Sequence, residues 1–449
     1  MANPRFQEFD PRTKLATIAG MLPAVRRLLT TMAGAAAVVS LARCAAPVPA
    51  FERELPWAQR GVWLKAETHV HTRFSDGSHT VDEVVDRAVG HGCDVLAVTD
   101  HTDGNLKAAT PEYHAAIAAA RERVGDRLTL IAGLEWNLPP GKGDDHAIVL
   151  LPPHVDAADL TADFKRRFDD FDKKGENPEL AVAAFEWLTA MKVNETPHLP
   201  VVFLNHPSRR AESVEHVYQQ MRTLTEIGGD VFVGAEGAPG HQKATPLGAY
   251  GRTLKPDDRW DPAIAPPGGA WDRLLTRDAR VAGALATSDF HSEANGDYWP
   301  CEFSATWVYA ADRSPVAVLE ALRAGSFSGV HGLIAQQPQL SLEAEGLPRP
   351  ALAGEAVSIP AGTQATAVVR VVVPPTDWQG APNRIDAVDL IGASPQGTAV
   401  MQSGPLAADG VFRFAFTVPE GGVAVRARGR RVVDDGPDLL FYTNAVMVQ

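Results

Sequence analysis

The chain has 449 residues, of which 45% are hydrophobic and 22% are charged, so a wholly disordered chain is excluded. Its formal net charge of −13 argues against binding to a nucleic-acid backbone, because such binding needs a basic face. Its three cysteines, Cys44, Cys93 and Cys301, are too few for a disulfide framework, and none lies in a C-x-x-C metal-binding spacing.

The first 50 residues differ in composition from the rest of the chain. Arg26 and Arg27 precede an apolar run of small residues at 32–42, an order that is typical of a secretory signal. The adjacent arginines permit a twin-arginine signal. Because the run is shorter than the roughly 20 residues that cross a bilayer, we expect an exported protein, located in the bacterial periplasm, whose mature chain has no transmembrane span. The competing interpretation is a disordered cytoplasmic extension.

From about Trp63 to His331, short apolar runs alternate with helical patterns, which is typical of β-α units around a parallel sheet. In the first unit Thr80 and Glu83 form a capping box for a helix. Residues 95–98 then form a continuously apolar strand of the kind that is buried on both faces. Further strands are predicted at 128–134, 147–151, 201–204, 231–233 and 281–286, and helices at 213–227 and 315–324.

After residue 337 the pattern changes to short alternating stretches separated by Gly and Pro clusters, which indicates an all-β sandwich. We therefore predict a signal peptide and N-terminal extension over residues 1–50, a β/α domain over 51–337 and a β-sandwich-like domain over 338–449. The last domain is interpreted as a structural or targeting module. Its strands are predicted at 365–373, 387–391, 411–418, 423–428 and 439–448.

Histidines and carboxylates cluster where the predicted β/α strands end or begin. Side chains at the carboxyl ends of barrel strands converge on one mouth. A hydrogen-bonded core residue would be the better interpretation of one such histidine, but not of six. Imidazoles and carboxylates suit Zn, Mn or Fe, and so many ligands exceed what one ion uses, so two to three divalent metal ions are expected. The nine candidate ligands are His69, His71, Asp76, His101, Glu135, His146, His206, Asp289 and His291.

These motifs, with Asn205-His206-Pro207 among them, resemble the polymerase and histidinol phosphatase (PHP) superfamily over about residues 62–335. The resemblance implies a distorted (β/α)7 barrel with a di- or trinuclear metal centre. The export signal and the β-rich tail make the layout similar to the CehA/McbA-type branch, which includes carbamate and amide hydrolases. The resemblance implies three metal sites. The first would be held by His69, His71, Glu135 and Asp289, the second by Asp76, His101 and His291, and the third by Glu135, His146 and His206.

The expected reaction is hydrolysis by a metal-bridging hydroxide, which forms at neutral pH because bound water is acidified. We expect a phosphoesterase for a small phosphate ester, with Asp76, His101 and His291 at the reacting centre. Arg209 and Arg210 would clamp a phosphate oxygen, or else form an ordinary surface pair. The alternatives are a carbamate, amide or ester hydrolase with the same centre and a non-catalytic envelope-binding protein. The sequence leaves the substrate and the oligomeric state open.

Other residues near these motifs carry weaker expectations. Asp100 points to the opposite side of its strand from His101, so we expect it to anchor a loop. Glu236 faces the mouth if the strand register holds, but no role follows from the sequence. Cys93 and Cys301 lie in no nucleophile motif, and no Gly-x-Ser-x-Gly elbow occurs.

Overall fold

The computed structural model describes residues 49–139, 145–169, 178–190, 198–240, 243–248, 253–277 and 283–449. The predicted signal segment and Cys44 lie outside these residues, so export stays a prediction. Within the described part of the chain, no helix combines the length and the apolar character that a membrane crossing requires.

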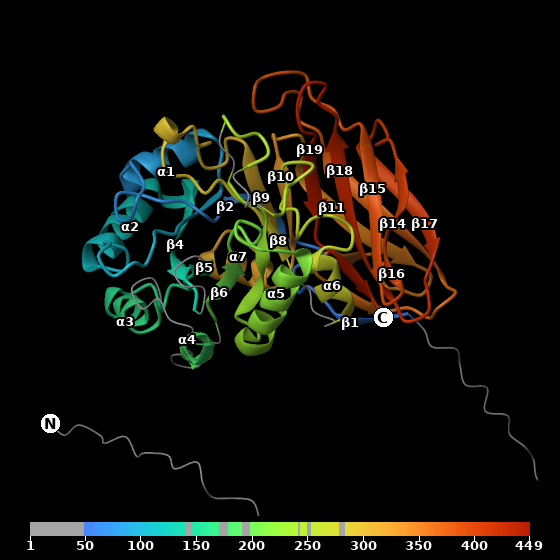
Figure 1. Cartoon of the computed structure of the whole chain (residues 1–449). Helices are drawn as coiled ribbons and strands as arrows, with labels where there is room; N and C mark the ends of the chain where they lie inside the picture. The colour runs from blue at the N-terminus through green and yellow to red at the C-terminus, as the bar shows by residue number, and fades with distance from the viewer. Residues whose placement is uncertain are drawn as a thin grey trace, which may run out of the picture. The chain divides into compact units, whose positions relative to one another are not determined.

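Seven strands form a curved sheet whose neighbours are parallel, with one exception (Figure 1). The exception is β5, which runs antiparallel to both β4 and β6. The predicted distorted barrel of β-α units is confirmed, and the reversal of β5 is its distortion. In pairing order the strands are β2 (Val62–Glu67), β3 (Val95–Val98), β4 (Thr129–Asn137), β5 (His146–Leu150), β6 (Val201–Leu204), β7 (Phe232–Ala238) and β8 (Gly283–Ala286).

Helices flank these strands (Figure 1), and two of them begin at caps that the sequence predicts. The predicted capping box is confirmed, because the Thr80 hydroxyl accepts from Glu83 N at 3.3 Å and the Glu83 carboxylate accepts from Thr80 N at 2.8 Å. Ser314 caps the last helix ahead of Pro315. The helices are α1 (Val81–Gly90), α2 (Pro111–Val124), α3 (Ala158–Phe168), α4 (Pro178–Ala190), α5 (Val214–Gly228), α6 (Ala270–Arg277) and α7 (Pro315–Arg323).

The C-terminal region is all-β, as predicted. The order β12-β11-β14-β17 forms one sheet, and β13, β20, β18, β19, β15 and β16 belong to the other. The single strand predicted at 439–448 is divided in two, because β19 pairs with β10 (Phe327–His331) whereas β20 pairs with β13. The strands are β11 (Gln336–Ala344), β12 (Ala351–Leu352), β13 (Ala356–Ser358), β14 (Gln364–Val372), β15 (Ala387–Ser394), β16 (Gly397–Gly404), β17 (Val411–Thr417), β18 (Val423–Arg431), β19 (Leu439–Thr443) and β20 (Val446–Val448).

The barrel sheet and the C-terminal sheet are continuous. Strands β9 (Ser304–Ala310) and β10 (Phe327–His331) extend the barrel beyond β2, and β10 then pairs antiparallel with β19. The short strand β1 (Ala50–Arg53) pairs with β13, so residues near the start of the described chain join the C-terminal region. The predicted boundary at residue 337 falls inside β11, so the division of the chain into domains at that residue stays a prediction.

A disulfide joins Cys93, just before β3, to Cys301, just before β9. The sequence alone does not predict this pairing, because the two cysteines are 208 residues apart in the chain. The bond is formed because β2 pairs with β3 on one side and with β9 on the other, which brings the two segments together.

Candidate metal centre

The structure brings all nine candidate ligands to one end of the barrel. Most of them follow the carboxyl end of a parallel strand. His146 instead opens β5, and it reaches the same end because β5 runs antiparallel to its neighbours. Three groups of side chains lie close enough to hold a metal ion: His71, Asp76, His101 and His291; His69, His71 and Asp289; and His101, Glu135 and His146.

Glu135 is buried at the centre of these groups, and its two carboxylate oxygens face different sets of histidines. Its Oε2 lies 3.3 Å from His69 Nε2, 3.2 Å from His71 Nε2 and 3.2 Å from His101 Nδ1. Its Oε1 lies 3.0 Å from His146 Nδ1 and 3.3 Å from His206 Nε2. This is the arrangement that a carboxylate needs in order to bridge two ions.

Asp289 completes the group around His69 and His71. Its Oδ1 lies 3.2 Å from His69 Nε2 and 3.3 Å from His71 Nε2. Asp289 and His206 both have a positive φ, of 46° and 28°. Residues other than glycine rarely adopt this conformation, and such strain is concentrated at functional sites.

Asp76 belongs to the more exposed group, and its carboxylate is half exposed. Its Oδ1 lies 3.4 Å from His71 Nδ1, and its Oδ2 lies 3.4 Å from His291 Nε2 and 3.8 Å from His101 Nε2. The structure therefore places His71 between two groups, whereas the family resemblance gave it to the first metal alone.

The donor set fits divalent cations. Nitrogen and oxygen atoms of His69, His71, Glu135 and Asp289 face one another at 3.1 to 3.3 Å. An ion placed between them would be coordinated by the lone pairs of all four side chains. Burial lowers the pKa of His71, but hydrogen bonds with Asp289 and Glu135 raise it by more, to about 10. The two carboxylates thus favour a positive charge at this point, which a bound cation would supply in place of the proton. Burial lowers the pKa of His101 to about 3 and that of His206 to about 4, so these imidazoles are neutral, as metal ligands must be.

Residues behind the ligands hold the loops in place. The Asp100 carboxylate accepts from Thr72 N at 2.8 Å, from the Thr72 hydroxyl at 2.7 Å and from the Ser75 hydroxyl at 2.6 Å. This confirms its predicted role in anchoring a loop, here the loop that carries Asp76. Asn205, to which the sequence analysis gave no role, donates from Nδ2 to Glu135 Oε1 at 2.7 Å and accepts from Ile148 N at 2.8 Å.

The two candidate arginines differ in their placement. Arg209 Nη2 donates to Asp289 Oδ2 at 3.1 Å, so its guanidinium lies at the edge of the ligand groups while its side chain stays 39% exposed. Arg210 is exposed beside it. A phosphate-binding role for either arginine remains a prediction.

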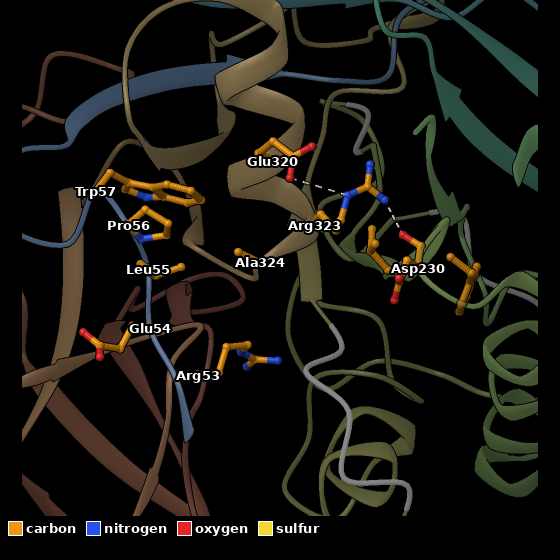
Figure 2. A pocket seen from close by; sticks show the side chains of 11 residues that line it. Arg53, Glu54, Leu55, Pro56, Trp57, Asp230, Glu320, Arg323 and Ala324 are labelled. Atoms are coloured by element: carbon orange, nitrogen blue, oxygen red, sulfur yellow. Dashed lines mark hydrogen bonds and ion pairs between the residues drawn. The ribbon is translucent and has the colours of Figure 1, made fainter. Parts of the chain in front are cut away.

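A cavity of about 560 Å³ lies elsewhere, at the amino end of β7 (Figure 2). Arg323 points into it and donates to the carbonyl oxygens of Asp230 and Leu199. Glu320 is 3.9 Å from the same guanidinium. Arg323 is thus engaged with the backbone and with Glu320, and the candidate ligands lie at the other end of the strands.

Comparison with known proteins supports the assignment of the domain. Residues 67–229 match the family model of the PHP domain, and no curated protein matches the chain. A two-domain protein from Bacteroides vulgatus, described as containing a predicted PHP-like metal-dependent phosphoesterase, shares 15% identity at a TM-score of 0.42, over 88% of this chain and 97% of its own. An amidohydrolase from Chromobacterium violaceum shares 20% identity at a TM-score of 0.30, over 52% of this chain and 89% of its own.

The family match and the ligand groups support the resemblance to the PHP superfamily, whereas closeness to the CehA/McbA-type branch stays a prediction. The chain therefore contains a PHP domain, and with this centre of histidines and carboxylates it is a metal-dependent hydrolase.

Proposed function

We propose that the protein is an exported phosphoesterase that acts on a small phosphate ester with two or three divalent ions, of Mn, Zn or Fe. The observation that carries the proposal is the two-sided environment of Glu135, with His69, His71 and His101 at one oxygen and His146 and His206 at the other. Such an arrangement supports adjacent ions, and adjacent ions stabilise an anionic phosphoryl group at more than one oxygen.

The residues of the centre would have two roles, which are metal binding and the orientation of the substrate. Bound ions would supply an activated water at neutral pH and polarise the substrate. Glu135 and Asp289 would hold the ions with the surrounding histidines. Arg209 is fixed at the edge of the centre by Asp289, where its remaining N–H groups can orient a phosphate oxygen.

The alternative is a carbamate, amide or ester hydrolase with the same centre. Its uncharged carbonyl substrate gains less from a guanidinium than a phosphate does. The exposed cation of Arg209 therefore favours the phosphoesterase. Inertness towards both substrate classes would instead favour the non-catalytic binding protein.

Export is the other part of the proposal. The bond between Cys93 and Cys301 supports it, because disulfides persist in oxidising compartments such as the periplasm.

The experiment compares Arg209→Met with the native protein on a phosphomonoester and on an aryl carbamate. We expect kcat/KM on the phosphomonoester to fall about 10- to 100-fold, the loss of one charge-assisted contact, while activity on the carbamate changes less. Arg222→Met is the matched control, because Arg222 is an exposed arginine on α5 that pairs with Glu226 at 3.1 Å and belongs to none of the ligand groups. Metal content is measured in parallel, and equal losses on both substrates with the metal retained would contradict the phosphoesterase assignment.

A further inference from the structure

Glu236, on β7, is fully buried beside the metal centre but belongs to none of the three ligand groups. Its Oε1 is 2.7 Å from His69 Nδ1 and accepts from the Thr287 hydroxyl at 2.8 Å. Its Oε2 accepts from the backbone N–H of His206 at 2.7 Å. The three partners lie just beyond the ends of β2, β8 and β6, so one carboxylate ties three ligand-bearing segments together.

The contact with His69 determines which nitrogen of that imidazole carries a proton and which one can coordinate a metal. A carboxylate only accepts hydrogen bonds, so Nδ1 must carry a proton. In the neutral form of the ring, which is the form that binds a metal, Nε2 then keeps its lone pair. His69 Nε2 is the atom that lies 3.3 Å from Glu135 Oε2 and 3.2 Å from Asp289 Oδ1. Glu236 thereby points the coordinating nitrogen of His69 into the ligand group.

The contact with His206 holds a strained backbone. His206 has a φ of 28°, and its N–H is fixed by Glu236 while its ring reaches Glu135 Oε1 at 3.3 Å. Thr287 stands two residues before Asp289, whose φ is also positive. The same carboxylate thus supports ligands on both sides of Glu135.

A neighbouring carboxylate shows that this arrangement is specific. Glu67 is also fully buried, and it accepts from the backbone N–H groups of Thr68, His69 and Ser288 at 2.8 to 2.9 Å. These contacts fix the backbone and do not involve the nitrogens of the His69 ring. Of the two carboxylates, Glu236 is the one that contacts the ring of His69.

We propose that Glu236 is a positioning residue that sets the tautomer of His69 and the backbone of His206, and so determines the affinity of the centre for divalent cations. The inference rests on the metal centre proposed above but not on which bond is cleaved.

The test is the zinc affinity of Glu236→Gln, measured by competition with a chromogenic chelator. A glutamine has a single oxygen, so this oxygen can replace only one of the two that accept from His69 Nδ1 and His206 N. The NH2 group would then face the N–H of the other partner, and two donors cannot form a hydrogen bond. We expect the affinity for Zn²⁺ to weaken about 10- to 100-fold, the usual cost of losing such an outer partner. Glu355→Gln is the matched control, because Glu355 is a fully buried carboxylate of the C-terminal region that binds Arg349 and the backbone N–H of Leu55. It should be less stable but bind zinc within about 2-fold of the native protein.

A second readout addresses the tautomer directly. Long-range proton–nitrogen NMR spectra of zinc-loaded protein with ¹⁵N-labelled histidine should assign an Nδ1–H tautomer to His69. This signal should change in Glu236→Gln. If that variant does not fold, Glu236→Asp keeps the carboxylate at a shorter reach and should also bind zinc more weakly with an unchanged far-UV spectrum.

The outcomes separate this inference from the proposed function. Zinc binding by the native protein with equal affinity in the Glu236 variants would overturn the positioning role alone. An equal loss in Glu355→Gln would overturn it too, because the effect would then be one of general stability. Failure of the native protein to bind zinc, manganese or iron would overturn the metal centre itself.

Discussion

At the scale of single residues, the centre depends most on the carboxylate of Glu135. Five histidines approach its two oxygens at 3.0 to 3.3 Å, and Asn205 fixes its orientation by donating to Oε1 at 2.7 Å. His146 by contrast contacts only the Oε1 side. The two residues should therefore contribute unequally to metal binding.

We predict that Glu135→Ala loses more metal per chain than His146→Ala does. Removing Glu135 takes a ligand from both sides of the centre, whereas removing His146 takes one ligand from one side. The measurement is elemental analysis of each purified variant, with far-UV circular dichroism to verify folding. Equal metal content in the two folded variants would contradict the bridging role of Glu135.

At the scale of secondary-structure elements, the position of the ligands depends on how strands pair. The antiparallel β5 presents its first residue, His146, at the end of the barrel where the parallel strands present their last ones. The segment after β8 carries Asp289 and His291, and it continues to Cys301, which is bonded to Cys93 before β3. Lys65 Nζ adds to this connection by donating to Cys301 O at 3.0 Å.

We predict that replacing both Cys93 and Cys301 by serine lowers the free energy of unfolding by about 3–5 kcal/mol, since the bond closes a long loop in the unfolded chain. Metal content at 25 °C should be unchanged, because neither cysteine contributes to the ligand groups described. The measurement is denaturant unfolding with and without a reductant. The double variant should be insensitive to the reductant, and a native protein that is equally insensitive would contradict the contribution of the bond.

At the scale of the whole molecule, the barrel and the C-terminal region share buried polar contacts as well as a sheet. Arg426 on β18 donates to the Asp272 carboxylate on α6 at 2.7 and 2.9 Å, and both side chains are buried. It also donates to Ala265 O at 3.0 Å. Together with the pairing of β10 and β19, these contacts favour cooperative unfolding of the two regions.

We predict one calorimetric unfolding transition, and a loss of about 3–5 kcal/mol in Arg426→Ala, because Asp272 would remain as an unpaired buried charge. Arg428→Ala is the control, since Arg428 pairs with Asp389 inside the C-terminal region. It should have the smaller effect, because Arg428 is more exposed than Arg426. Two separate transitions would show that the regions fold independently, in agreement with the predicted boundary at 337.

The sequence by itself determined the features that depend on neighbouring residues. The capping box of Thr80 and Glu83 is local, and so is the apolar strand at 95–98. The spacing of His69 and His71, and of Asp289 and His291, likewise identified the ligand-bearing strand ends without any knowledge of packing. These patterns suffice because helix capping and strand alternation act over only a few residues.

Only the tertiary structure decided which distant groups meet. The reversal of β5, the pairing of β10 with β19 and the bond between Cys93 and Cys301 each depend on segments far apart in the chain. Glu236 is the clearest case, because its sequence context gave no role, while its contacts with His69 and His206 span 167 and 30 residues. Hydrogen bonds of this kind are fixed by the register and curvature of the assembled sheet, which no short stretch of sequence specifies.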